Sequence, residues 1–305
     1  MCKVLYIAGY GRSGTTVLDV LLGAHDRMVS VGELVYLGQE WRHDERACAC
    51  GSAYEHCSFW ANAIQNERDT KELTQLARQV DYRRALPRLL TRSLSAEVRR
   101  GYRDRMRTLF SYVAERGDAD WVVDSSKSGR HAAGRFWALR NVADLDIQVI
   151  HLVRDGRDVL NSVVEKGTNW AAEEFRKEKT FRAERAIVGW VLANGLAWTL
   201  GLGLDEDRYL RVRFEDLLSQ PESVLQRIGA FMGEDLSHVI DRVSAGGSFS
   251  VGHNVGGNRL RKKERILLRR KENVRRQPWK GLSPYHRSLF GLLGQWLNQS
   301  FGYTI

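Results

Sequence analysis

Residues 3–16 read KVLYIAGYGRSGTT, and this stretch decides the fold class. Lys3–Ala8 is short, rich in aliphatic and aromatic side chains and followed by glycine, which is the pattern of a buried β-strand. A helix with its apolar side chains on one face is predicted from Thr15 to Ala24. In a strand, glycine loop and helix N-terminus, backbone N–H groups can approach an anion that the helix dipole also favours. We therefore predict a phosphate-binding loop at residues 9–16.

The loop differs from the nucleotide-binding P-loop at one decisive position. The pattern G-x-x-x-x-G-K-[ST] fits at Gly9, Gly14 and Thr16, but Thr15 stands where the lysine belongs. Without that lysine, a nucleoside triphosphate loses a contact to its β- and γ-phosphates. The cation of this loop is Arg12 instead. A kinase-like phosphotransferase, with a later acidic strand binding magnesium, stays an alternative at this point.

Three further buried strands alternate with helices along the chain. The strands are predicted at Asp120–Asp124, Asp146–Val153 and Arg208–Phe214. The helices are predicted at about 131–140, 155–165, 186–200 and 221–232. This alternation predicts an α/β, P-loop-like three-layer fold with a central parallel sheet and helices on both faces. We expect a single domain over residues 1–305, with a mostly helical, Arg-rich insertion at about 42–116.

The composition excludes several classes of protein. Hydrophobic residues at 43% and charged residues at 28% are ordinary globular values, which exclude a disordered or fibrous chain. No run approaches the ~18 uncharged apolar residues of a membrane span. The N-terminus has no signal-peptide pattern, so we expect a cytoplasmic protein without a membrane partner. The sequence leaves the oligomeric state open.

The net charge of +10 is concentrated in two segments. Residues 259–280 hold eleven basic and two acidic residues, and residues 83–107 hold nine arginines and two acidic residues. Such patches suit a polyanion, so a non-enzymatic RNA- or polyanion-binding protein is a further alternative. Few aromatic residues lie among these charges, which disfavours base stacking and therefore nucleic acid as the partner. Residues 83–107 also fit a solvated helix face.

Three of the four cysteines, Cys48, Cys50 and Cys57, lie in the stretch ACACGSAYEHC, with His43 and His56 nearby. Clustered thiolates and imidazoles can bind zinc, but structural zinc sites usually present C-x2-C pairs, which this spacing lacks. A disulfide would need an oxidising compartment. We therefore predict a structural loop that is dispensable for chemistry and no metal, with zinc as the alternative.

Two motifs resemble those of the PAPS-dependent sulfotransferases, which use 3′-phosphoadenosine 5′-phosphosulfate (PAPS). The family's 5′-phosphosulfate loop reads K/R-S-G-T/S-T/S, and residues 12–16 read RSGTT. The arginine form is similar to the carbohydrate and tyrosylprotein branches, and we expect a bacterial type. VIHLVRDGRDVLNS, residues 149–162, resembles the family's 3′-phosphate motif, a strand followed by R-x7-S.

The resemblance implies a set of donor-binding residues. An arginine fork at a strand end and a hydroxyl on the following helix, here Arg154 and Ser162, can together embrace one phosphate. Gly257 and Asn258 resemble the G-N-x-x-R region that closes over the nucleotide in the family. Either Arg259 or Arg261 could contact the phosphate. The full predicted set is Arg12, Ser13, Gly14, Thr15, Thr16, Arg154, Ser162, Gly257, Asn258, Arg259 and Arg261.

The resemblance also implies catalytic residues. Sulfuryl transfer is an in-line displacement in which the protein mainly positions the reactants and neutralises charge, a task for Arg12 and Lys127. Glu33 follows Gly32 as in the G-E element of tyrosylprotein sulfotransferases and is the predicted general base, with Asp124 in reserve. The predicted reaction moves the sulfuryl group of PAPS to a hydroxyl of a small-molecule, glycan or tyrosyl acceptor and releases 3′-phosphoadenosine 5′-phosphate (PAP).

Overall fold

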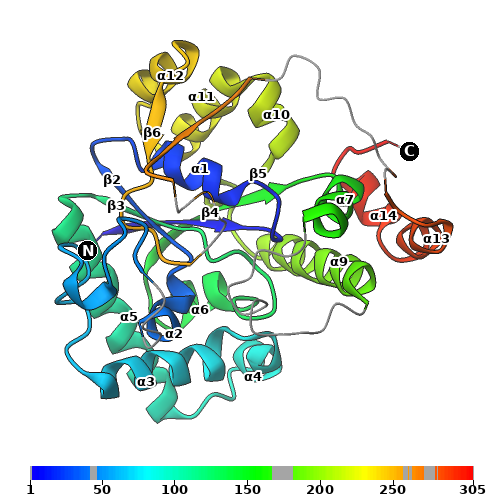
Figure 1. Cartoon of the computed structure of the whole chain (residues 1–305). Helices are drawn as coiled ribbons and strands as arrows, with labels where there is room; N and C mark the ends of the chain where they lie inside the picture. Colours follow the sequence, from blue (N-terminus) through cyan, green and yellow to red (C-terminus); the bar gives the residue numbers. More distant parts are fainter. Residues whose placement is uncertain are drawn as a thin grey trace.

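The computed structural model describes residues 2–41, 47–166, 181–256, 260, 263–270, 279 and 281–304. Its centre is a sheet of five parallel strands (Figure 1). In spatial order these are β2 (Met28–Gly32), β3 (Trp121–Asp124), β1 (Lys3–Ala8), β4 (Asp146–Val153) and β5 (Tyr209–Arg213). Because the strands are parallel, their carboxyl ends meet at one edge, where open α/β sheets bind ligands.

β1 lies in the middle of the sheet and is buried on both faces. Val4 is paired with Val122 of β3 on one side and with Ile147 of β4 on the other. Val4, Tyr6 and Ala8 pack into the core on one face, whereas Leu5 and Ile7 pack into a second core on the opposite face. This alternation follows from the two-residue period of a strand.

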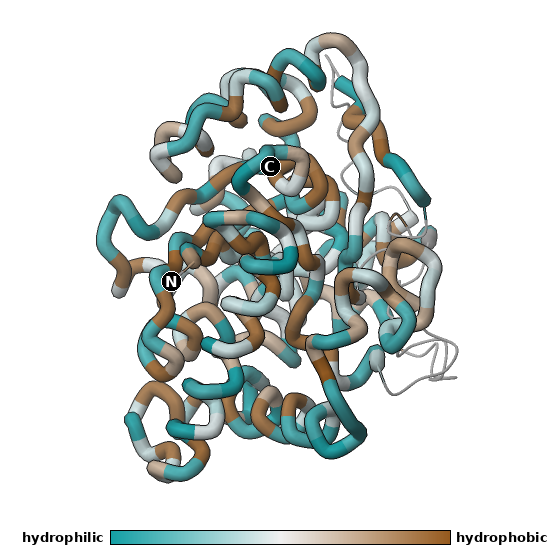
Figure 2. Tube along the Cα trace, turned by 90° about the vertical axis from the view of Figure 1, so that its left-hand side faces the viewer, coloured by the Kyte–Doolittle hydropathy of each residue, from teal (hydrophilic) through white to brown (hydrophobic). Residues whose placement is uncertain are grey.

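Helices cover both faces of the sheet, as predicted (Figure 1). One face carries α1 (Thr15–Leu22), α10 (Phe214–Ser219), α11 (Pro221–Met232) and α12 (Ser237–Ser244). The other carries α2 (Leu37–Glu40), α3 (Glu67–Leu76), α4 (Leu86–Leu90), α5 (Ala96–Gly117) and α6 (Arg135–Asn141). Beside β4 and β5 lie α7 (Gly156–Lys166), α9 (Arg182–Gly201), α13 (Pro284–Leu293) and α14 (Gln295–Ser300). Figure 2 shows hydrophobic and hydrophilic stretches alternating along the outer helices, as expected for helices with one buried face.

The structure confirms the α/β class and the four predicted strands, within one residue at each end. It adds β2, whose sequence MVSVG is short and only partly buried, and a small antiparallel pair, β6 (Ser248–Ser250) and β7 (Arg265–Leu267). The helix expected from about residue 131 begins only at Arg135, because residues 129–134 form turns instead.

The described part of the segment predicted as an insertion, residues 47–116, contains helices and no strand of the central sheet. Trp60, Leu73 and Phe110 of this segment pack in the same core as Val4 and Tyr6 of β1. The insertion therefore builds one face of the core. Among the described residues, no helix has the length and apolar character that crossing a membrane requires.

Candidate active site

The glycine loop runs from the end of β1 to the start of α1 and depends on two glycines. Gly9 has a φ of 136°, and a Cβ there would lie 2.4 Å from the carbonyl oxygen of Leu152. Gly14 has a φ of 88°, and a Cβ there would lie 2.1 Å from the ring of Phe214. A residue with a side chain fits neither position, so the loop conformation requires glycine.

The arginine of the loop meets the second predicted motif directly. Arg12 Nε donates a hydrogen bond of 3.0 Å to Ser162 Oγ on α7. The guanidinium of Arg154, at the end of β4, donates to the carbonyl oxygen of Arg12 at 2.8 Å. Two motifs about 140 residues apart in the sequence are therefore brought together. The fold therefore brings Arg12, Arg154 and Ser162, which the sequence analysis assigned to donor binding, to one edge of the sheet.

Two buried polar atoms at this edge have no hydrogen-bond partner among the described residues. They are Oγ of Ser13 and Nε of Arg154. Buried polar groups in native proteins are nearly always paired, so such atoms point to a ligand. Thr15 and Thr16 open α1, where backbone N–H groups have no partner within the helix. Together these groups are suited to an anion with several oxygen atoms.

A buried network holds the turn that carries Arg154. Glu215, at the start of α10, accepts a hydrogen bond from the backbone N–H of Asp155 at 3.1 Å. Asn298 of α14 accepts from the N–H of Gly156 at 2.9 Å and donates to the Asp155 carboxylate at 3.1 Å. Arg157 forms a buried ion pair with Asp155 at 2.7 Å. The sequence analysis did not identify Asn298, since no local pattern links it to this turn.

The predicted base and the predicted lysine are in contact with each other. Glu33 follows β2, Lys127 follows β3, and Lys127 Nζ forms an ion pair with Glu33 Oε1. Both side chains are nearly buried: 7% of the Glu33 side chain and 12% of the Lys127 side chain are exposed. The backbone N–H of Glu33 donates to the carbonyl oxygen of Val255 at 2.7 Å, and the hydroxyl of Tyr6 donates to the carbonyl oxygen of Lys127. The pair is therefore held by the backbone on both sides.

The reserve base, Asp124, lies in a different environment. Its Oδ2 accepts from Arg135 Nε at 2.9 Å, and its Oδ1 accepts from the backbone N–H of Ser126 at 2.9 Å. Arg135 also pairs with Asp81 at 2.9 Å. Burial alone would lower the pKa of Arg135, but the charges of Asp124 and Asp81 outweigh it and raise that pKa above its usual value. Both oxygens of Asp124 are thus engaged in a buried structural network, and it does not line the cavity described next.

A cavity of about 430 Å³ lies against the ion pair of Glu33 and Lys127. Its wall is largely apolar and includes Val188, Leu192 and Leu196 of α9. The rest of the lining includes Tyr10 of the glycine loop, Tyr36 after β2, Arg83 of the insertion, and Arg130 and His131 in the turns after β3. The volume is in the range of small-molecule sites.

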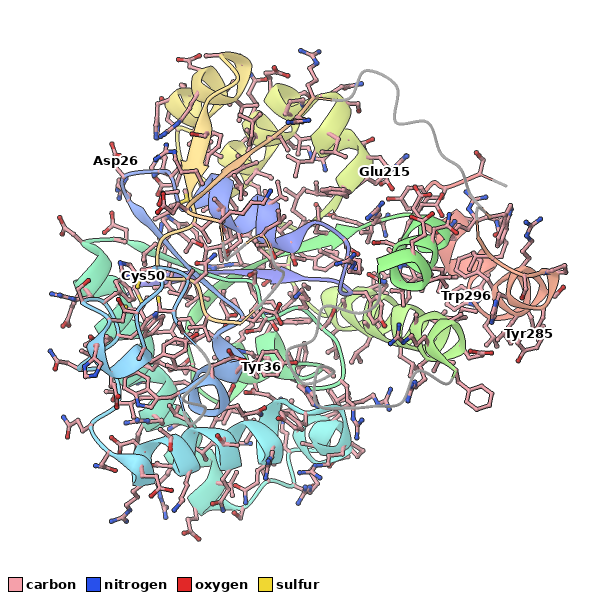
Figure 3. The ribbon with its side chains drawn as sticks, viewed as in Figure 1. Asp26, Tyr36, Cys50, Glu215, Tyr285 and Trp296 are labelled. Carbon is pink, nitrogen blue, oxygen red and sulfur yellow. The ribbon has the colours of Figure 1, made fainter. Side chains whose placement is uncertain are left out.

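His131 also lines this cavity. It falls within the helix predicted from about residue 131, but in the structure it lies in a turn before α6. Its Nδ1 is 3.0 Å from the hydroxyl of Tyr36, which Figure 3 labels, and burial raises the pKa of that hydroxyl well above its usual value. The remaining predicted residues, Gly257, Asn258, Arg259 and Arg261, lie outside the described residues.

Comparisons with known proteins agree with the fold. The model of a family described as "Sulfotransferase family" matches residues 5–238. The sulfotransferase domain of the Synechococcus PCC 7002 olefin synthase superposes with a TM-score of 0.53 at 18% identity, over 99% of this chain and 95% of that one. The sulfotransferase domain of the curacin biosynthetic pathway superposes with a TM-score of 0.55 at 16% identity, over 96% and 98%. No curated protein matches the chain.

Proposed function

This chain belongs to the sulfotransferase family, and on that basis we propose that it moves the sulfuryl group of PAPS to a hydroxyl of a small-molecule acceptor. The enzyme class is that of the family, sulfuryl transfer. The donor, the acceptor and the role of each residue are the proposal. The observation that carries it is the meeting of Arg12, Arg154 and Ser162 beside a cavity that contains Glu33 and Lys127.

The residues at the edge of the sheet fit a donor that carries two phosphate groups. Arg12 and the amides of the loop are suited to the 5′-phosphosulfate, and Arg154 with Ser162 to the 3′-phosphate. The unpaired Oγ of Ser13 and Nε of Arg154 support this, because an anion would satisfy both. PAPS supplies an activated sulfuryl group when bound. Thr15 in place of the P-loop lysine argues against a nucleoside triphosphate in the same loop.

Glu33 and Lys127 are the groups with which the protein acts on the acceptor. Glu33 takes the proton of the attacking hydroxyl, a role for which a carboxylate must lie within hydrogen-bond reach of the acceptor. Lys127 orients that carboxylate through their ion pair, and its ammonium stabilises negative charge on the transferred group. Their low exposure strengthens both interactions, because less water screens the charges.

The shape and chemistry of the cavity suggest the class of acceptor. The apolar wall from α9 suits an acceptor with an apolar body, and Arg83 and Arg130 suit a polar or anionic end. We therefore favour an amphipathic alcohol or phenol over a fully polar glycan. In a series of hydroxyl compounds of rising apolar area, the expected trend is a falling KM. A KM that does not change across the series contradicts this assignment.

The donor is tested by binding PAP to an Arg154→Ala variant. A hydrogen bond to a charged group contributes about 1.5–3 kcal/mol, so PAP affinity should fall by about tenfold to over a hundredfold. The affinity for adenosine 5′-phosphosulfate, which lacks the 3′-phosphate, should fall much less. Arg140→Ala, which breaks only a surface ion pair with Asp205, is the matched control. Equal losses for the two ligands in calorimetry would remove Arg154 from the 3′-phosphate site.

The base is tested by a Glu33→Gln variant. Loss of a general base typically costs about 10²–10⁴ in rate, so kcat should fall by this range while PAP affinity stays nearly unchanged. Glu206→Gln, at an exposed glutamate, should keep normal kinetics. A Glu33→Gln variant that retains about a third of kcat is far above that range and contradicts the role. A variant that loses PAP affinity instead would make Glu33 a structural residue.

A further inference from the structure

Among the described residues, three thiols and one imidazole meet beside β2. This Cys3His cluster consists of Cys48, Cys50, Cys57 and His253, whose ligand atoms all lie within 4.8 Å of one another. Cys50 Sγ is 3.7 Å from Cys57 Sγ. His253 Nδ1 is 3.7 Å from Cys48 Sγ and 3.2 Å from Cys57 Sγ. Tetrahedral zinc, with Zn–S near 2.3 Å and Zn–N near 2.0–2.1 Å, separates its ligand atoms by about 3.5–3.8 Å.

The surroundings hold these four side chains in place. Trp60 Nε1 donates a hydrogen bond of 2.7 Å to the carbonyl oxygen of His253, and the ring of Phe59 stacks on its imidazole at 5.1 Å. Cys48 begins a turn in which its backbone N–H donates a hydrogen bond of 2.9 Å to the carbonyl oxygen of Ser52. Cys48 and Cys57 are buried, and Cys50, labelled in Figure 3, is exposed. The ligands therefore come from a loop and a distant segment that are already packed together.

We propose that the Cys3His cluster binds one Zn²⁺ ion as a structural site. Four closely spaced protein ligands of sulfur and nitrogen, as here, are typical of structural zinc, whereas catalytic zinc keeps a position open for water. Binding leaves three thiolates and a neutral imidazole on the metal, and the three thiol protons pass to solvent. No redox partner is required.

The fourth ligand explains why the cysteine spacing did not predict a metal. His253 lies 196 residues after Cys57, so the cluster forms only in the folded chain. His56, which the sequence placed near the cysteines, is exposed and lies beside Glu55, and His43 lies outside the described residues. The cysteines therefore lack the paired C-x2-C spacing of common zinc sites, because one loop supplies three ligands and a distant segment supplies the fourth.

The proposed ion would also support the catalytic segment. Two residues after His253, the N–H of Val255 donates to the carbonyl oxygen of Val31 in β2 at 2.8 Å, and its carbonyl oxygen accepts from the N–H of Glu33 at 2.7 Å. The metal would thus fasten the loop with Cys48 to the segment that holds the backbone of Glu33. We expect metal loss to lower thermal stability first and activity as a consequence.

The test measures the metal content of the full chain, purified under reducing conditions and without a chelator. Elemental analysis should find one zinc per chain, and replacement by Co²⁺ should give the thiolate charge-transfer and strong d–d bands of a tetrahedral site. Cys57→Ser and His253→Gln should each weaken binding by about tenfold or more. His253→Cys should restore it, since a fourth thiolate is also a zinc ligand. Zinc added to the apo wild type should raise its Tm.

Cys2→Ser is the matched control, because Cys2 lies outside the cluster and its thiol contacts the carbonyl oxygen of Phe110. It should retain full zinc. Equal zinc in Cys57→Ser and the wild type would overturn the proposal, as would a metal-free wild type whose Tm does not respond to zinc. A disulfide between Cys50 and Cys57, found by mass spectrometry of unreduced peptides, would also overturn it, since a cross-link would then replace the metal.

Discussion

Gly14 is the residue at which the backbone leaves the glycine loop and enters α1. Its φ of 88° lies in the left-handed region, where a side chain is strained, and Phe214 occupies the space a Cβ would need. Phe214 in turn lies under the guanidinium of Arg154, 5.4 Å from its ring centre. Because Gly14 has no side chain, the glycine loop, α10 and the end of β4 can pack together.

We expect Gly14→Ala to disturb donor binding far more than Gly11→Ala. A Cβ on Gly14 forces the ring of Phe214, or the loop itself, to move, whereas a Cβ on Gly11 meets nothing within 4 Å. Strain at such a position costs on the order of 1–3 kcal/mol, which corresponds to about fivefold to over a hundredfold in PAP affinity if binding must overcome it. Calorimetry on both variants checks this. Similar affinities for the two would show that the space behind Gly14 is not limiting.

At the scale of an element, α1 is tied to β2 through one buried carboxyl group. Asp19 accepts hydrogen bonds of 2.6 Å from Ser30 of β2 and from Asn254. Its Oδ1 is buried without a partner among the described residues. Burial raises the pKa of Asp19 from 3.8 to about 7. The folded chain therefore keeps a proton on Asp19 that the unfolded chain loses at lower pH.

This pKa predicts a pH-dependent effect of Asp19→Asn. Between pH 4 and pH 7 the unfolded wild type has released the proton and the folded one has not, so the free energy of unfolding falls as pH rises. Asparagine cannot ionise, so the free energy of unfolding of the variant does not show this fall with pH. Its stability relative to wild type should rise by up to about 1.4 kcal/mol per pH unit and level off above pH 7. Urea unfolding at pH 5 and pH 8 measures the difference. Asp26→Asn, at an exposed position, is the control, and an equal change in both variants contradicts the prediction.

α5 shows how the Arg-rich insertion uses its charge. Arg103 donates to the carbonyl oxygen of Val142 at 3.1 Å, and Arg107 donates to that of Ala143 at 2.8 Å. Both arginines therefore fasten α5 to the turn after α6. A segment whose sequence suited a polyanion-binding surface thus serves in part to hold the fold together, as lysine and arginine side chains often do.

At the scale of the whole molecule, the C-terminal helix supports the candidate donor site. Asn298 of α14 bonds the turn after Arg154, the hydroxyl of Tyr303 donates to Glu215 at 2.6 Å, and Arg157 donates to the carbonyl oxygen of Thr304 at 2.7 Å. These contacts join the end of the chain to β4 and α10. Burial and the adjacent Glu215 raise the pKa of Tyr303 well above its usual value, so its hydroxyl stays protonated and continues to donate.

Asn298→Ala should therefore destabilise the protein and weaken PAP binding together. It leaves the N–H of Gly156 without its partner, and an unsatisfied buried group costs about 1–3 kcal/mol. Urea unfolding should show this loss, and PAP affinity should fall because the turn that positions Arg154 is less constrained. Gln299→Ala, at an exposed position of the same helix, should change neither quantity. A loss of stability at unchanged affinity would limit Asn298 to a structural role.

The fold class and the glycine loop could be predicted because their signals are local. A continuous apolar strand, glycines at set spacing and a helix start all lie within residues 3–16, and the later strands repeat the same short-range pattern. β2 escaped prediction because only part of MVSVG is buried, and its pairing with β3 is a property of the sheet. Local propensity cannot report a partner strand that lies about 90 residues away.

The pairing of side chains across the site depended on the folded chain. Arg12 contacts Ser162 across 150 positions, Glu33 contacts Lys127 across 94, and Cys57 contacts His253 across 196. The resemblance named the residues of the first two pairs without saying that they touch, and His253 had no signal in the sequence. Parallel strands bring the first two pairs together because their carboxyl ends share one edge, and the order of strands in the sheet sets which loops become neighbours there. The third pair meets because the segment with His253 runs along the end of β2, where Val255 bonds to Val31 and Glu33.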